Sequence, residues 1–106
     1  MSRILLVRTT FGDPDEAARI ARLMIDDRLA ACASLAPTRS IYRWQGAIET
    51  DDETVVLFKT TQDRGATLMA AIGGLHSYEL PVIEAWTAEV DPAVAAWIEA
   101  ETAVVS

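Results

Sequence analysis

The chain has 106 residues, enough for one domain with its own core and too few for a second. Sixteen acidic against nine basic residues give a net charge of −7, which excludes partners with anionic surfaces, namely nucleic acids and acidic membranes. The single cysteine, Cys32, excludes an internal disulfide and fits a reducing compartment. The first apolar run, Ile4–Val7, is too short for a signal peptide or a membrane span. We therefore expect a cytoplasmic protein with a single domain over residues 1–106.

The N-terminal quarter predicts a buried strand followed by a helix. Arg3–Thr10 carries the apolar run and is bounded by Gly12. Asp13 is a suitable N-cap, and Pro14 suits the first helical position. The helix should continue to about Leu29, because apolar side chains recur at helical spacing at Ala17, Ile20, Ala21, Met24 and Leu29.

The centre of the chain predicts one long β-hairpin. Its first strand starts within Leu29–Leu35 and resumes at Ser40, with a bulge or kink expected at Pro37, because proline cannot donate to a sheet ladder. Gln45-Gly46 forms the corner, where glycine can take a positive φ. The returning strand runs to Thr61 and includes four consecutive apolar residues, Val55 to Phe58. Both faces of this strand therefore need cover.

The C-terminal third predicts a helix, a strand and a last helix. Thr60 or Thr61 can cap the first of these, and Gly73-Gly74 should stop it at Ile72 or loosen its last turn. Residues 82–87 read as a strand, after which Asp91-Pro92 starts a helix. This last helix should dock through Val94, Trp97 and Ile98.

The predicted order β-α-β-β-α-β, with an additional C-terminal helix, is that of an α+β ferredoxin-like fold. Right-handed crossovers place both main helices on one face of the sheet, which leaves an apolar face bare on the other side. Because such a face is an aggregation liability, we expect a closed homo-oligomer. We predict that Tyr42, Trp44, Val56 and Phe58 belong to the subunit interface, with Tyr42 and Trp44 on one face of the hairpin tip.

Few residues suggest chemistry. Cys32 lies in an apolar strand, which favours a buried core residue, with a metal thiolate as the alternative. His76 follows a helix, where a histidine is commonly a surface residue or interacts with the C-terminal end of the helix dipole. However, Tyr78 and Glu79 lie close by in the sequence, and an imidazole together with a carboxylate suits copper or zinc. The acidic run 51–53 is most simply solvated. The sequence has no glycine-rich phosphate loop and no spaced cysteine cluster, so we expect no enzymatic activity and no required cofactor.

Three segments resemble the CutA family of divalent-cation tolerance proteins. They are Asp27–Cys32, Ser40–Gly46 and Leu75–Pro81. Residues Asp91 to Trp97 also resemble the family's C-terminal helix, and all four blocks agree with the family in order and spacing. The resemblance implies a ferredoxin-like subunit in a tight homotrimer, a role in tolerance of copper and other divalent ions, and no established catalysis. The chain departs from the family pattern at Gln45, Ala47, Ser77 and Val82, which removes polar groups around a candidate pocket.

The resemblance and the ligand chemistry together lead to a metal hypothesis. His76 and Glu79, with Cys32 as a third ligand, would bind copper or a similar divalent ion near a subunit boundary. The alternative is a small-molecule-sensing trimer like the PII signal transducers, which carry a long loop where this chain has the tight Gln45-Gly46 corner. A third reading, an acylphosphatase-type enzyme, lacks an arginine-bearing phosphate loop.

Overall fold

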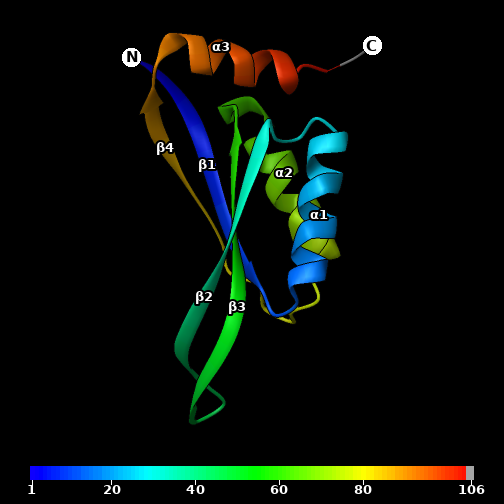
Figure 1. Ribbon diagram of the computed structural model, residues 1–106, viewed down its shortest axis with the longest axis vertical. Coiled ribbons are helices and arrows are strands. Elements are labelled where there is room, and N and C mark those ends of the chain that lie inside the picture. The colour runs from blue at the N-terminus through cyan, green and yellow to red at the C-terminus, as the bar shows by residue number, and fades with distance from the viewer. Residues whose placement is uncertain (105–106) are drawn as a thin grey trace.

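Four antiparallel strands form one sheet in the order β2-β3-β1-β4 (Figure 1). The computed structural model describes residues 1–104. Its elements are β1 (Ser2–Phe11), α1 (Pro14–Asp26), β2 (Cys32–Trp44), β3 (Ala47–Thr60), α2 (Gln62–Leu75), β4 (Ile83–Val90) and α3 (Pro92–Glu101). The predicted ferredoxin-like order with an added C-terminal helix is confirmed.

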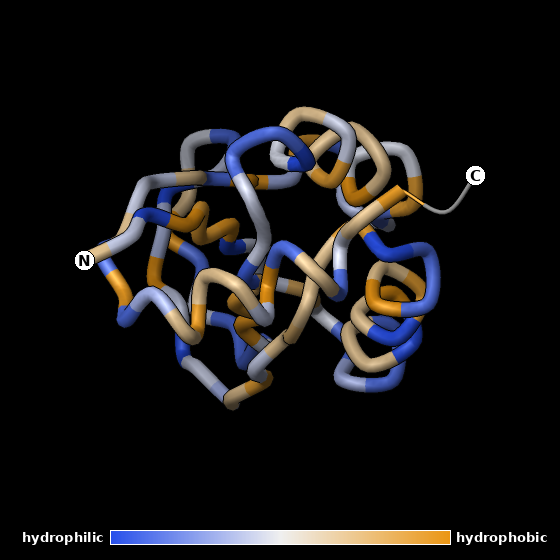
Figure 2. Tube along the Cα trace, turned by 90° about the horizontal axis from the view of Figure 1, so that it is seen from above, coloured by the Kyte–Doolittle hydropathy of each residue, from blue (hydrophilic) through white to orange (hydrophobic). Residues whose placement is uncertain are grey.

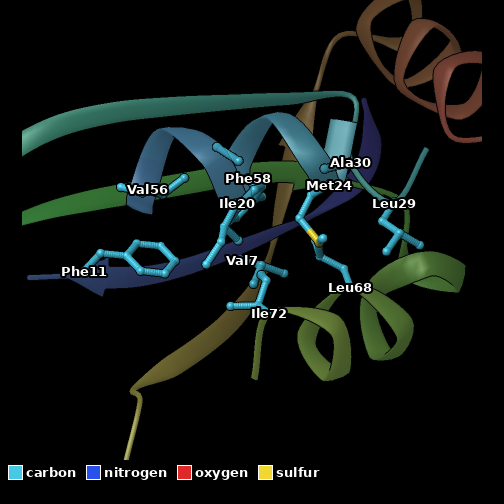
Figure 3. Packing of buried hydrophobic residues seen from close by; sticks show 12 residues of the cluster. Val7, Phe11, Ile20, Met24, Leu29, Ala30, Val56, Phe58, Leu68 and Ile72 are labelled. Carbon is cyan, nitrogen blue, oxygen red and sulfur yellow. The ribbon is translucent and has the colours of Figure 1, made fainter. Parts of the chain in front are cut away.

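Helices α1 and α2 cover one face of the sheet and enclose the main core (Figures 1 and 3). Both helices begin at predicted caps: the Asp13 carboxylate accepts from the Asp15 amide at 3.0 Å, and the Thr61 hydroxyl accepts from the Arg64 amide. Side chains from the strands and both helices interdigitate in this layer, among them Val7, Phe11, Ile20, Met24, Val56, Phe58, Leu68 and Ile72. The helices thus bury only one side of each strand.

The prediction that Val56 and Phe58 form the subunit interface is wrong. Both side chains are fully buried against α1 and α2 within their own chain. Successive side chains alternate between the faces of a strand, so Val55 and Leu57 point to the opposite face instead. The run of four apolar residues hid this alternation, and only the pairing of β3 with β1 determines which two residues enter the core.

Helix α3 covers one end of the opposite sheet face, so that face is less bare than predicted. Ile98 packs there against Ile4 and Ala31, with Leu6 and Ala88 at the edge of the cluster. The predicted docking stripe is only partly correct, because Val94 and Trp97 remain exposed. Farther along the same face, Arg8 pairs with Glu84 at 2.7 Å and lies over the ring of Trp86. The hydropathy-coloured trace in Figure 2 has hydrophobic segments on the strands as well as on the helices.

The hairpin formed by β2 and β3 extends beyond the helices as an arm (Figure 1). The chain measures 45 × 29 × 20 Å, and its radius of gyration of 14.5 Å exceeds the roughly 13 Å of a compact domain of this length. Gln45 and Gly46 form a two-residue turn with φ values of 50° and 84°, the positive values that suit a tight hairpin. The arm therefore has no long loop at its tip.

The predicted interruption at Pro37 is wrong. The pairing of β2 with β3 runs without a shift from Cys32–Lys59 to Trp44–Ala47, and Pro37 lies opposite Thr54 within it. β2 is an edge strand, so a residue whose nitrogen points outward needs no ladder partner. Hydrogen-bonded and non-hydrogen-bonded pairs alternate along an antiparallel ladder, starting from the hydrogen-bonded pair Trp44–Ala47 beside the turn. This alternation places Pro37 and Thr54 in a non-hydrogen-bonded pair, so the Pro37 nitrogen points away from β3.

Helix α2 continues through Gly73 and Gly74 to Leu75, rather than stopping at Ile72. The amide of His76 donates to the carbonyl of Ile72 at 2.9 Å and closes the last turn. This hydrogen bond and the burial of Ile72 offset the helix cost of two glycines, about 1 kcal/mol each. The loop that follows begins at His76, next to the end of β1.

Candidate functional site

The loop between α2 and β4 is anchored by His76. The His76 ring stacks on Phe11 with centroids 4.3 Å apart and the planes 11° from parallel. Its Nε2 lies 2.8 Å from the Thr10 carbonyl oxygen and 3.3 Å from Thr9 Oγ1, while Nδ1 accepts from the Tyr78 amide at 3.1 Å. This geometry assigns the proton to Nε2. Both ring nitrogens are thus engaged within the chain, and a metal would have to displace one of these bonds.

The structure does not bring the three predicted metal ligands together within one subunit. Cys32 on β2 pairs with Lys59 on β3, and Lys59 in turn pairs with Leu6 on β1. His76 contacts Thr10, which lies four residues farther along β1. At about 3.3 Å per strand residue, this offset is roughly 13 Å. Within residues 1–104, no group of three or more His, Cys, Asp or Glu side chains could hold a metal ion.

Cys32 is not the core residue that its apolar neighbours predicted. Ala30 and Ala31 are buried, but Cys32 begins the edge strand β2 and is a free, partly exposed thiol. Its strand partner Lys59 is two residues from Leu57, so both of these side chains lie on the face of β3 that points away from α1 and α2. Cys32 is directly opposite Lys59 and therefore lies on that same sheet face. The thiol is therefore accessible in the isolated subunit.

One tyrosine–carboxylate hydrogen bond joins the loop to the arm, and a second lies within the arm. Tyr78 donates to Glu53 on β3 at 2.6 Å, which ties the loop to the arm, and Tyr42 donates to Asp51 within the arm. Burial, followed by the Glu53 hydrogen bond, raises the pKa of Tyr78, and the hydrogen bond to Asp51 raises the pKa of Tyr42 to about 12. Both phenols consequently stay protonated and act as donors.

Two small residues permit the loop to take this position. A Cβ atom at Gly12 would lie only 3.1 Å from the Tyr78 phenol oxygen, so glycine leaves room for the ring. Ser77 donates to the carboxylate of Glu16 at 2.8 Å, which ties the loop to the first turn of α1. Ser77 is one of the departures from the family pattern, and its hydroxyl supplies this tie.

A cleft of about 690 Å³ lies where the loop meets the base of the arm. Its lining includes Tyr42, Trp44, Glu53, Tyr78, Leu80 and Val82. Tyr42 and Trp44 share one strand face, as predicted, and are 40% and 41% exposed, because the chain's own helices do not reach the arm. Glu79 also lines the cleft, so this predicted ligand faces the cleft while Cys32 does not.

Sequence reasoning missed Glu53 and Thr10 as members of this site. The acidic run 51–53 reads as solvated, but Glu53 is partly buried and accepts the Tyr78 hydrogen bond. The alternation of side chains along a strand offered a signal. Glu53 and Val55 are two residues apart on β3, so their side chains lie on the same sheet face, opposite α1 and α2. No sequence pattern indicates that Tyr78, 25 residues away, reaches it.

These features define a class of protein. The chain is a ferredoxin-like α+β subunit with a long hairpin arm, a C-terminal helix on the second sheet face, and a cleft between the arm and the loop after α2. No helix within residues 1–104 is both long and apolar enough to cross a bilayer.

Comparison with known proteins gives the family. The family model of the CutA1 divalent ion tolerance protein matches residues 5–101, so the chain belongs to this family. It is 38% identical over 80 residues to the divalent-cation tolerance protein CutA of Pyrococcus horikoshii, covering 76% of this chain and 78% of the relative. The CutA of Thermotoga maritima is also 38% identical over 80 residues, with 76% and 79% covered.

Solved structures agree with this assignment. CutA1 from Ehrlichia chaffeensis superposes with a TM-score of 0.92 at 27% identity, covering 98% of this chain and 99% of the other. CutA from Xylella fastidiosa gives a TM-score of 0.91 at 36% identity, covering 96% and 100%. The structure from Archaeoglobus fulgidus is described as periplasmic, and the cytoplasmic location of the present chain stays a prediction.

Proposed function

We propose that this protein acts as a homotrimer in the tolerance of divalent cations such as copper. The observation that carries the proposal is family membership: the match extends over residues 5–101, and the family is described by divalent ion tolerance rather than by a catalysed reaction. The net charge of −7 supports it, because an acidic protein attracts cations.

The trimer is supported by apolar side chains that the subunit leaves uncovered. On the arm, Ile41 and Ile48 are 71% and 66% exposed on one face, while Tyr42 and Trp44 are partly exposed on the other. An arm that exposes large apolar side chains on both of its faces favours cover from other chains. The edges of the sheet, β2 and β4, offer further unpaired backbone for contacts between copies.

Metal contact is the less direct part of the proposal. Cys32 supplies a partly exposed soft ligand on the sheet face opposite the main helices. Glu79 supplies a carboxylate at the cleft, and His76 supplies an imidazole at the start of the same loop. Because Cys32 lies apart from His76 within a subunit, we treat them as two separate contacts for copper. A neighbouring copy would have to complete either set of ligands.

Calorimetric titration of copper and zinc tests these contacts, with magnesium as the hard-ion control. Loss of binding in Cys32→Ser alone would assign copper to the sheet face, and loss in His76→Ala alone would assign it to the loop. Affinity should fall as the pH is lowered, because protons compete for thiolate and imidazole. Unchanged copper binding in both variants would reject both contacts.

Tolerance itself is tested in copper-challenged cells that lack their own family member. Expression of this chain should restore growth, and Trp44→Ala, which should weaken assembly, should restore it less well. Equal growth with and without the protein, at equal expression, would contradict a role in tolerance.

A further inference from the structure

We propose that the hydrogen bond from Tyr78 to Glu53 is a latch that holds the arm in the orientation needed for assembly with other copies of this chain. The Tyr78 phenol donates to the Glu53 carboxylate at 2.6 Å, from the loop after α2 to β3. The inference rests on the proposed trimer, and it adds a residue outside the arm that controls how the arm is presented to a neighbouring copy.

Glu53 lies at the point where the arm loses the support of the sheet. β3 pairs with β1 as far as Thr54, which is opposite Phe11. From Glu53 to Ala47, β3 pairs with β2 alone. A two-stranded hairpin is only marginally stable without further packing. The strand ladder by itself therefore determines only weakly the direction in which the arm leaves the body of the subunit.

The latch is the one side-chain hydrogen bond, within residues 1–104, that joins the arm (residues 38–53) to the rest of the chain. The other two side-chain hydrogen bonds of the arm stay inside it, from Arg39 to Asp52 and from Tyr42 to Asp51. A hydrogen bond with an ionised acceptor is stronger than one between neutral groups. The Glu53 carboxylate is such an acceptor at the base of the arm, so the latch is placed where it can fix the arm.

The loop holds Tyr78 ready for this contact. The Tyr78 amide donates to Nδ1 of His76 at 3.1 Å, and the centroids of the two rings are 4.9 Å apart. His76 in turn stacks on Phe11 and bonds the carbonyl of Thr10. These contacts fix the loop to the last residues of β1. Tyr78 thus connects the end of the supported sheet to the first residue of the arm.

A fixed arm favours assembly because its apolar side chains must meet another copy in one orientation. Ile41 and Ile48 are exposed on one face of the arm, and Tyr42 and Trp44 on the other. An arm that samples several orientations presents the competent one only part of the time, and the apparent affinity falls by that fraction. Each subunit contributes one arm, so the loss recurs in every copy.

Tyr78→Phe tests the latch, since it keeps the ring and removes the hydrogen bond to Glu53. We expect the concentration at which the assembly half-dissociates to rise about tenfold or more. The measurement is analytical ultracentrifugation over a dilution series, in a fixed urea concentration at which the wild type dissociates measurably. Amides of residues 47–53 should also exchange hydrogen faster, while those of β1 should not change. An unchanged half-dissociation concentration would overturn the proposal.

Glu53→Gln and Asp52→Asn form a matched pair, since each removes one negative charge from the arm. Glu53→Gln weakens the latch and should weaken assembly. Asp52→Asn disrupts only a contact within the arm, to Arg39, and should leave assembly unchanged. Tyr78→Phe combined with Glu53→Gln should weaken assembly no more than Tyr78→Phe alone, because both remove the same bond. Additive losses, or an equal loss in Asp52→Asn, would overturn the proposal.

The same measurements separate the latch from the proposed function. A wild-type chain that stays monomeric at all concentrations would contradict the proposed trimer, and the latch with it. A Tyr78→Phe variant that assembles as tightly as a trimeric wild type would overturn the latch and leave the trimer in place.

Discussion

Replacing Trp44 by alanine should weaken assembly, because its ring is a large apolar surface on the arm that the subunit itself does not cover. A tryptophan buries up to about 250 Å², so its 41% exposure leaves roughly 100 Å² for a neighbouring copy. At about 25 cal/mol per Å², covering this surface contributes about 2.5 kcal/mol per subunit. Within one chain, by contrast, Trp44→Ala removes little packing.

The expected result is dissociation at concentrations where the wild type remains assembled, measured by light scattering during size exclusion and by the melting temperature over a dilution series. Leu23→Ala is the control, since Leu23 is 38% exposed on α1 and no assembly contact is assigned to it. If Trp44→Ala retained the oligomer and melting temperature of the wild type, the arm would not be an assembly element.

Three further predictions concern the subunit. Phe58→Ala should lower the free energy of unfolding by about 3 to 5 kcal/mol in chemical denaturation, because Phe58 is fully buried beneath the helices, whereas Leu35→Ala at the exposed edge should cost much less. Thr60→Val should cost about 1 to 3 kcal/mol by leaving the Leu29 carbonyl without its 2.7 Å donor; an unchanged denaturation midpoint would contradict this. In ultraviolet titration Tyr42 should ionise near pH 12, and Asp51→Asn should lower the pKa of Tyr42. Because this pKa is higher in the folded than in the unfolded chain, the stability contributed by the protonated phenol is complete below about pH 10 and is lost as the pH rises through 12.

Local chemistry allowed much of the fold to be predicted from the sequence. The Asp13-Pro14 and Asp91-Pro92 pairs mark the starts of α1 and α3, and Gln45-Gly46 marks the hairpin turn. These signals act within a few residues, so they can be recognised without the tertiary structure. The order of elements, and with it the ferredoxin-like fold, follows from them.

Features that depend on pairing between strands could not be predicted in the same way. Val55 to Phe58 is apolar throughout, so the sequence does not say that Val56 and Phe58 face the helices. Pro37 is tolerated because β2 lies at the edge of the sheet, a property of strand order rather than of local sequence.

The candidate site depends on such long-range contacts even more. The sequence indicates a cluster of His76, Tyr78 and Glu79, but the hydrogen bond from Tyr78 to Glu53 links segments that are distant in the sequence. The separation of Cys32 from His76 likewise follows from the register of β2 against β3 and β1. Residue type predicted the ligand chemistry, and only the fold could show which groups come together.

The mass of the native assembly tests the trimeric arrangement most directly. Sedimentation equilibrium of the wild type at micromolar concentration should give three times the subunit mass of 11.5 kDa, because the arm and the second sheet face require cover from other copies. A folded species of 11.5 kDa throughout the concentration range would contradict this arrangement.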